Sequence, residues 1–142
     1  MTVKPLDETN RALCQTIVHR ITAGPQQRIS FAEYMDLVLY DPQGGYYTNQ
    51  ALSIGAVGDF FTAAHLGPDF GELLGEQFVQ MWQGMGRPIP FTLVEMGAGQ
   101  GILAADLLKY VRSQHPDFFQ ALEYKIVEKA RVRFREQQQQ LP

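Results

Sequence analysis

The stretch LVEMGAGQG, residues 93–101, restricts the possible folds of this chain more than any other segment. The apolar run that contains its first half, Phe91–Met96, has the length and composition of a buried parallel strand. Three glycines follow the run at alternate positions, and an apolar helical pattern starts at Ile102. A strand, a glycine turn and a helix in this order are typical of a βαβ unit, so we expect an α/β fold.

A glycine turn between a strand and a helix can admit a ligand close to the backbone, because no Cβ atom stands in the way. The amides and the positive dipole end of the following helix point toward that ligand. Gly97 can make the tight turn, while Gly99 and Gly101 permit close approach and packing, with Ala98 between the first two. The turn therefore predicts a cofactor site, although a glycine turn of this kind can also be purely structural.

The spacing of the glycines distinguishes two classes of cofactor. The dinucleotide fingerprint GxGxxG would require glycine at position 102 or 104, where Ile102 and Ala104 stand. Only the form of the motif that tolerates alanine could begin at Gly99. An acid followed by three alternating glycines instead resembles motif I of class I methyltransferases that use S-adenosylmethionine. Binding of a nicotinamide dinucleotide is the alternative.

Two acids lie where such a cofactor would need them. Glu95, at the end of the first strand, can hold the ammonium group of S-adenosylmethionine directly or through water. Glu128 follows the second strand candidate, Leu122–Val127, where an acid commonly accepts hydrogen bonds from both ribose hydroxyls. Glu128 could instead be a solvated acid that begins a helix, where the helix dipole favours it.

The periodicity of the remaining chain predicts a mostly helical segment over residues 1–89 and the first βαβα portion of a cofactor-binding domain over residues 90–142. Ser30 and Glu33 have the spacing of a capping box. Tyr46–Thr48 could form a short strand. The expected helices cover Asp7–Ala23, residues 31 to about 39, residues 68–83, Ile102–Val111 and Ala130–Gln140, with a break at His115-Pro116.

Composition and charge exclude several classes of protein. The formal net charge of −3 gives no reason to expect nucleic acid as a partner, and no apolar run reaches the roughly 20 residues that span a bilayer. The single cysteine, Cys14, allows no internal disulfide. The first residues lack a secretory apolar region and carry acids, which argues against a transit peptide. We therefore expect a bacterial-type cytoplasmic location without a signal or transit peptide.

Three blocks of sequence in a fixed order resemble the MidA family of S-adenosylmethionine-dependent methyltransferases. They are FAEYMDLVLYDPQGGYY (31–47), GDFFTAAHLGPDFGELLGEQ (58–77) and LVEMGAGQGILAADLL (93–108). The family is related to the assembly factor of mitochondrial respiratory complex I, a protein-arginine methyltransferase that makes symmetric dimethylarginine on a complex I subunit. The resemblance implies S-adenosyl-L-methionine as cofactor and an arginine of a complex I-type dehydrogenase subunit as acceptor.

The same resemblance implies which residues contact the cofactor: Glu95, Gly97, Ala98, Gly99, Gly101 and Glu128. It also implies that Asp59, Phe60 and Thr62 lie over the cofactor site or the acceptor channel. The family usually has serine after this threonine, whereas Ala63 stands here, so that hydroxyl is absent. Phe60 could equally be a core residue and Asp59 a turn residue. We assign no catalytic residue and expect no metal.

The length of the chain opens a further question. A class I methyltransferase sheet has about seven strands, and the sequence contains two that match its start. We therefore expect the N-terminal part of a Rossmann-like class I methyltransferase fold, preceded by a mostly helical segment, as a piece of a longer enzyme. The alternative is a non-catalytic assembly or interaction module that keeps the fold without turnover. The oligomeric state stays open.

Overall fold

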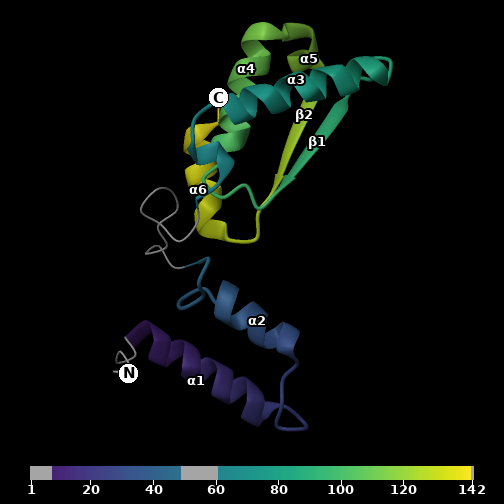
Figure 1. The fold of residues 1–142 in the computed structure, drawn as a ribbon. Coiled ribbons are helices and arrows are strands. Elements are labelled where there is room, and N and C mark those ends of the chain that lie inside the picture. Colours follow the sequence, from purple (N-terminus) through teal and green to yellow (C-terminus); the bar gives the residue numbers. More distant parts are fainter. Residues whose placement is uncertain (1–7, 49–60, 142) are drawn as a thin grey trace. The chain divides into compact units, whose positions relative to one another are not determined.

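The computed structural model describes residues 8–48 and 61–141, which belong to two compact units, Met1–Leu52 and Ser53–Pro142 (Figure 1). In the first unit, helices α1 (Glu8–Ala23) and α2 (Phe31–Tyr40) pack on each other. The predicted capping box at the start of α2 is confirmed. The amide of Glu33 donates to Ser30 Oγ at 3.2 Å, and the amide of Ser30 donates to Glu33 Oε2 at 2.8 Å.

The prediction of a strand at Tyr46–Thr48 is wrong, because these residues form a turn. The amides of Tyr46 and Tyr47 donate to the carbonyls of Val38 and Leu39 in the last turn of α2, at 2.9 and 2.8 Å. The last carbonyls of a helix have no partner within the helix, so the returning chain satisfies them. A strand pairing would have left them without these donors.

The first elements of the second unit that the structure describes are a short 3-10 helix, η1 (Ala63–His65), and α3 (Asp69–Gly84). It continues with β1 (Phe91–Met96), α4 (Ile102–Gln114), α5 (Pro116–Ala121), β2 (Leu122–Val127) and α6 (Arg131–Gln140). Both strands have the predicted bounds. The expected break at His115-Pro116 does end α4, but Pro116 also starts α5, because proline suits the first turn of a helix.

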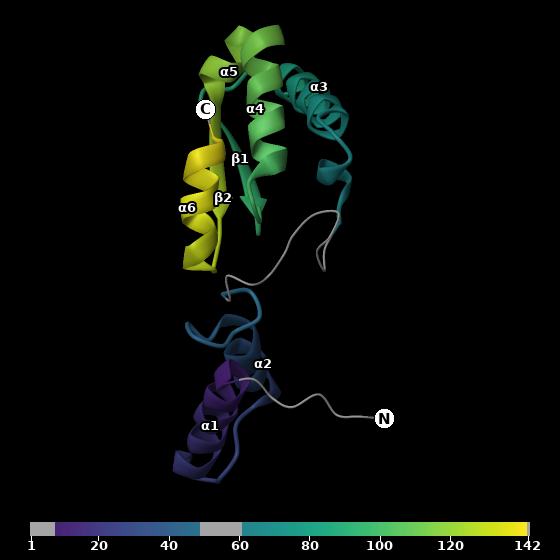
Figure 2. The same ribbon diagram turned by 90° about the vertical axis from the view of Figure 1, so that its left-hand side faces the viewer.

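The two strands are parallel, with Phe91 opposite Leu122 and Met96 opposite Val127 (Figures 1 and 2). Successive side chains alternate between the two faces of the sheet. The face that carries Phe91, Leu93 and Tyr124 packs against the core. The other face is exposed. This parallel βαβ arrangement, followed by a further helix, confirms the expected α/β class.

The core of this unit lies between α3, α4, α5 and the sheet. Phe118 of α5 is 1% exposed and contacts the rings of Trp82 and Phe91, with centroids 5.4 and 5.5 Å away. The indole Nε1 of Trp82 donates to the carbonyl of Pro88 at 3.0 Å, so this buried polar atom has a partner. The missed helix α5 therefore supplies the centre of the core.

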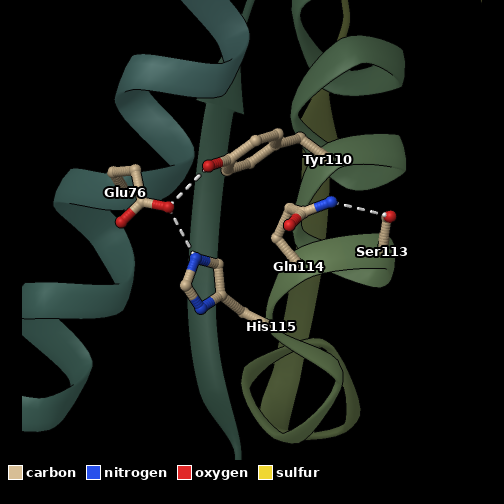
Figure 3. A network of polar contacts seen from close by, with 5 residues as sticks. All are labelled: Glu76, Tyr110, Ser113, Gln114 and His115. Carbon is tan, nitrogen blue, oxygen red and sulfur yellow. Dashed lines mark hydrogen bonds and ion pairs between the residues drawn. The ribbon is translucent and has the colours of Figure 1, made fainter.

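Helices α3 and α4 pack closely because two glycines of α3 face α4. A Cβ atom at Gly71 would lie 2.9 Å from Asp106 Cβ, and one at Gly75 would lie 3.0 Å from Tyr110 Cδ1. A polar contact spans the same two helices (Figure 3). Glu76 Oε1 accepts a hydrogen bond from the hydroxyl of Tyr110 at 2.6 Å and lies 2.6 Å from His115 Nε2. Together these contacts fix α4, whose N-terminus follows the glycine turn.

Among residues 8–48 and 61–141, no helix combines the length and the apolar character that crossing a bilayer requires.

The boundary between the two compact units lies after Leu52, so α3 belongs to the same unit as the sheet. The domain boundary predicted between residues 89 and 90 rests on the change from a helical to a βαβα sequence pattern, and it stays a prediction.

Candidate cofactor site

The glycine turn adopts a backbone that only glycine enters easily. Gly97, Gly99 and Gly101 have φ angles of 70°, 56° and 81°, all in the left-handed region. A residue with a Cβ atom there costs roughly 1–2 kcal/mol. The alternate spacing of the three glycines thus has a conformational reason at each position.

Hydrogen bonds hold the turn at the carboxyl end of the sheet. The amide of Gly97 donates to the carbonyl of Val127 at 2.9 Å, which joins the turn to the end of β2. The amide of Gly101 donates to Ala98 O at 2.8 Å, and Gly101 O then accepts the amide of Ala105 in the first turn of α4. The space beside Gly97 is open, since a Cβ atom there would meet nothing within 4 Å. A ligand can therefore approach the backbone at Gly97.

Glu95 lies on the packed face of the sheet, next to Tyr124. The hydroxyl of Tyr124 donates to Glu95 Oε2 at 2.7 Å. Burial raises the pKa of Glu95, and the hydrogen bond from Tyr124 opposes that rise only in part. A bound cation beside this half-buried carboxyl would favour its charged form, so Glu95 suits an ammonium ligand.

Glu128 directly follows β2, so its carboxylate stands at the same end of the sheet as the turn. Its Oε1 accepts the amide of Ala130 at 2.9 Å, at the residue that caps α6. This contact agrees with the alternative interpretation of Glu128 as an acid at a helix start. Each carboxylate oxygen can accept two hydrogen bonds, so Glu128 keeps acceptor capacity for a ligand.

Two residues of the site were not predicted from the sequence. Gln137 of α6 donates from Nε2 to Gly99 O at 2.9 Å, and its Nε2 lies 3.4 Å from Glu128 Oε2. Tyr124, which holds Glu95, is the other. The period-two alternation of β2 could have placed Tyr124 on the face of Glu95, whereas Gln137 belongs to a polar run without any such signal.

Thr62 is exposed and caps η1. Its amide and its hydroxyl lie 3.1 and 2.9 Å from Nδ1 of His65. Helix η1 contacts both α3 and α4. The amide donates to Nδ1, so the proton of a neutral His65 ring is on Nε2, a buried atom without a hydrogen-bond partner in the described part of the chain. Asp59 and Phe60, predicted beside Thr62, lie outside the described residues.

The site thus combines an open glycine backbone, a helix N-terminus and two carboxylates at one end of a parallel sheet. Such an arrangement can bind an amino-acid group and a ribose of one ligand. Within the described ranges, no group of three histidine, cysteine, aspartate or glutamate side chains could hold a metal ion.

The comparison with protein families agrees with the cofactor predicted for this site. Residues 73–142 match the model of the family described as "putative S-adenosyl-L-methionine-dependent methyltransferase". This range contains the glycine turn, both strands and α6. These residues are therefore similar to this methyltransferase family. The resemblance seen in the sequence motifs is confirmed.

Similar proteins extend the match beyond the range of the family model. A Burkholderia thailandensis protein, solved bound to S-adenosyl-homocysteine, superposes with a TM-score of 0.69 at 32% identity over 96% of this chain and 36% of its own. The expected Rossmann-like methyltransferase fold is thereby confirmed for this partial sheet.

Curated relatives agree with this result. The mitochondrial protein arginine methyltransferase NDUFAF7 homolog of Drosophila melanogaster is 48% identical over 89 residues, which are 63% of this chain and 20% of the relative. Human mitochondrial protein arginine methyltransferase NDUFAF7 is 36% identical over 107 residues, which are 75% of this chain and 23% of the relative. The chain thus spans about a fifth to a quarter of these methyltransferases.

Proposed function

We propose that this chain supplies the S-adenosylmethionine-binding part of a methyltransferase that acts on protein arginine. The observation that carries the proposal is the turn of three left-handed glycines at the end of β1, beside the carboxylate that follows β2. The S-adenosyl-homocysteine bound to the solved relative supports the cofactor, and the names of the curated relatives support the acceptor.

Different residues of the site would contact different parts of the cofactor. The open backbone at Gly97 would receive the amino-acid portion, whose ammonium would pair with Glu95. Glu128 would accept hydrogen bonds from the ribose hydroxyls. The glycines suit a ligand without phosphate, since GxGxxG would require glycine at position 102, and Ile102 begins α4 there.

Methyl transfer is an in-line displacement. An acceptor nitrogen forms a bond to the methyl carbon while the bond from that carbon to sulfur breaks and its electron pair stays on sulfur. The nitrogen then loses a proton. The main task of the enzyme is to hold donor and acceptor close and aligned, so a fixed glycine turn contributes by orienting the sulfonium. We assign no group to the removal of the proton.

We further propose a protein acceptor of the complex I-type dehydrogenase class. The family resemblance supports this class of acceptor, and the names of the relatives support a protein arginine as the methylated group. The cytoplasmic location expected from the first residues of the sequence stays a prediction.

Calorimetric titration tests the cofactor. We expect S-adenosyl-homocysteine to bind the chain with a stoichiometry of one, and NADH and NADPH to leave it unoccupied. Binding of NADH, with no heat from S-adenosyl-homocysteine, would support the nicotinamide alternative and contradict the proposal. Binding of neither ligand would favour the non-catalytic module.

Transfer of labelled methyl groups tests the acceptor. A complex I-type subunit should gain label from S-adenosyl-L-methionine when incubated with the protein, and hydrolysis should release dimethylarginine. The matched control is the same subunit with the labelled arginine replaced by lysine. Label that persists in this control would contradict an arginine acceptor while leaving the cofactor assignment intact.

A further inference from the structure

Gln137 differs from Gln138 and Gln139, which follow it in the same run. It is 3% exposed, whereas Gln138 and Gln139 are exposed. A buried amide needs hydrogen-bond partners, because leaving its polar atoms unpaired in the protein interior is unfavourable. The partners of its Nε2 are Gly99 and Glu128, which belong to the two halves of the proposed cofactor site.

The glycine turn is shaped to receive this side chain. A Cβ atom at Gly101 would lie 3.3 Å from Gln137 Cγ and 3.6 Å from Gln137 Cα, which is contact distance or closer. The missing side chain at Gly101 therefore lets α6 approach the turn. The methylenes of Gln137 cover Gly101, and the amide reaches Gly99 O beyond it.

The same amide also constrains Glu128. Backbone Ala130 N donates to Glu128 Oε1 at 2.9 Å, and Gln137 Nε2 lies 3.4 Å from the other oxygen, Oε2. Among the described residues, a donor thus approaches each oxygen of this carboxylate. The short bond to Gly99 is the stronger contact of Gln137, and the longer one to Glu128 is weaker.

We propose that Gln137 is a positioning residue that fixes the glycine turn relative to the ribose-binding carboxylate of Glu128. This inference rests on the proposed function. Gln137 would touch neither the reacting atoms nor the methyl group. It would hold the glycine turn and the Glu128 carboxylate in their binding positions before the cofactor arrives. Binding would then lose less conformational entropy, because these groups are already ordered.

The test compares Gln137→Met with Gln138→Met in calorimetric titrations with S-adenosyl-homocysteine. Methionine keeps the length of the side chain over Gly101 and removes the amide donors. We expect Gln137→Met to weaken binding about tenfold, as the loss of one buried hydrogen bond implies, and Gln138→Met to bind like the unaltered chain. Equal affinities of all three proteins would overturn the inference.

A double-mutant cycle separates positioning from general damage to the fold. If Gln137 acts through Glu128, then Gln137→Met should weaken binding much less in a Glu128→Gln background than in the unaltered chain. Fully additive losses would show that Gln137 does not act through Glu128, and would overturn this part of the inference.

Amide hydrogen exchange gives a readout that needs no ligand. In the free protein, Gln137→Met should speed exchange of the amides of residues 97–101, and Gln138→Met should leave them unchanged. If the unaltered chain fails to bind S-adenosyl-homocysteine, the proposed function fails. The exchange data then still decide whether Gln137 holds the turn.

Discussion

Tyr124 and Glu95 belong to neighbouring parallel strands, and the hydroxyl of Tyr124 donates a 2.7 Å hydrogen bond to Glu95 Oε2. The bond fixes a half-buried carboxylate in the last turn-side pair of residues of β1, close to the glycine turn in the sequence. It also partly offsets the burial that raises the pKa of Glu95. The ammonium contact proposed for Glu95 therefore depends on a residue of the other strand.

Replacing Tyr124 by phenylalanine should weaken binding of S-adenosyl-homocysteine about threefold to tenfold, because Glu95 loses the donor that orients it. The same change should raise the pKa of Glu95 further, since only burial then acts on it. The affinity measured by calorimetry between pH 5 and pH 8 checks both expectations. An unchanged affinity across this range would contradict a role of Glu95 at the ammonium.

The carboxylate of Glu95 should cost stability in the free protein. Its folded pKa lies above the reference value of 4.5, so the folded state binds the proton more tightly than the unfolded state. Stability should therefore fall as the pH rises from about 4.5 through the folded pKa. Glu95→Gln should remove this decrease in urea unfolding curves. If the stability of both proteins fell by the same amount over this pH range, the result would contradict the expectation.

Gly97→Ala tests whether the open space beside the turn receives the cofactor. The added Cβ meets no atom within 4 Å, but the φ angle of 70° makes the residue strained by roughly 1–2 kcal/mol. We expect binding of S-adenosyl-homocysteine to weaken at least about tenfold while the chain remains folded. The measurements are calorimetry and circular dichroism.

Gly84→Ala is the matched control, since a Cβ atom there also meets nothing and its backbone is helical. It should leave binding unchanged. If both variants bind like the unaltered chain, the turn serves structure alone.

Gly71→Ala should destabilise the fold by about 1–3 kcal/mol, because its Cβ would lie 2.9 Å from Asp106 Cβ and 3.1 Å from the amide nitrogen of Leu107. The helices α3 and α4 would have to move apart. Gly84→Ala, at the end of the same helix, should instead be neutral or stabilise by up to about 1 kcal/mol through helix propensity. Urea unfolding of both variants distinguishes packing from propensity, and equal effects would contradict the close contact.

The contact of Glu76 with Tyr110 and His115 should make stability depend on pH in the acid range. The hydrogen bond from Tyr110, and then that from His115, lowers the pKa of Glu76 below 4.5. Its stabilising contribution is therefore complete above about pH 4.5 and decreases as the pH falls through the folded pKa. The effect should be modest, because the side chain is 38% exposed to solvent.

Unfolding curves of the unaltered chain and of Glu76→Gln, recorded between pH 3 and pH 7, check this dependence. The difference in stability between the two proteins should shrink as the pH falls. A difference that stays constant over this range would show that Glu76 does not carry the pH dependence.

Local patterns predicted the elements whose signals lie within a few residues. The apolar runs at 91–96 and 122–127 gave both strands with their bounds, and Ser30 with Glu33 gave the cap of α2. The glycine turn was found because a left-handed backbone requires glycine at each position. The prediction of a break at Pro116 was incomplete, because the proline that follows one helix also starts the next helix, α5.

The sequence by itself thus determined the strands, the capped helix, the glycine turn and the family resemblance, because each depends on neighbouring residues or on a motif. Only the tertiary structure decided that Tyr124 holds Glu95 and that Gln137 joins Gly99 to Glu128. These pairs lie 29, 38 and 9 positions apart. Their contacts depend on the parallel register and on how α6 packs on the turn, which no local pattern encodes.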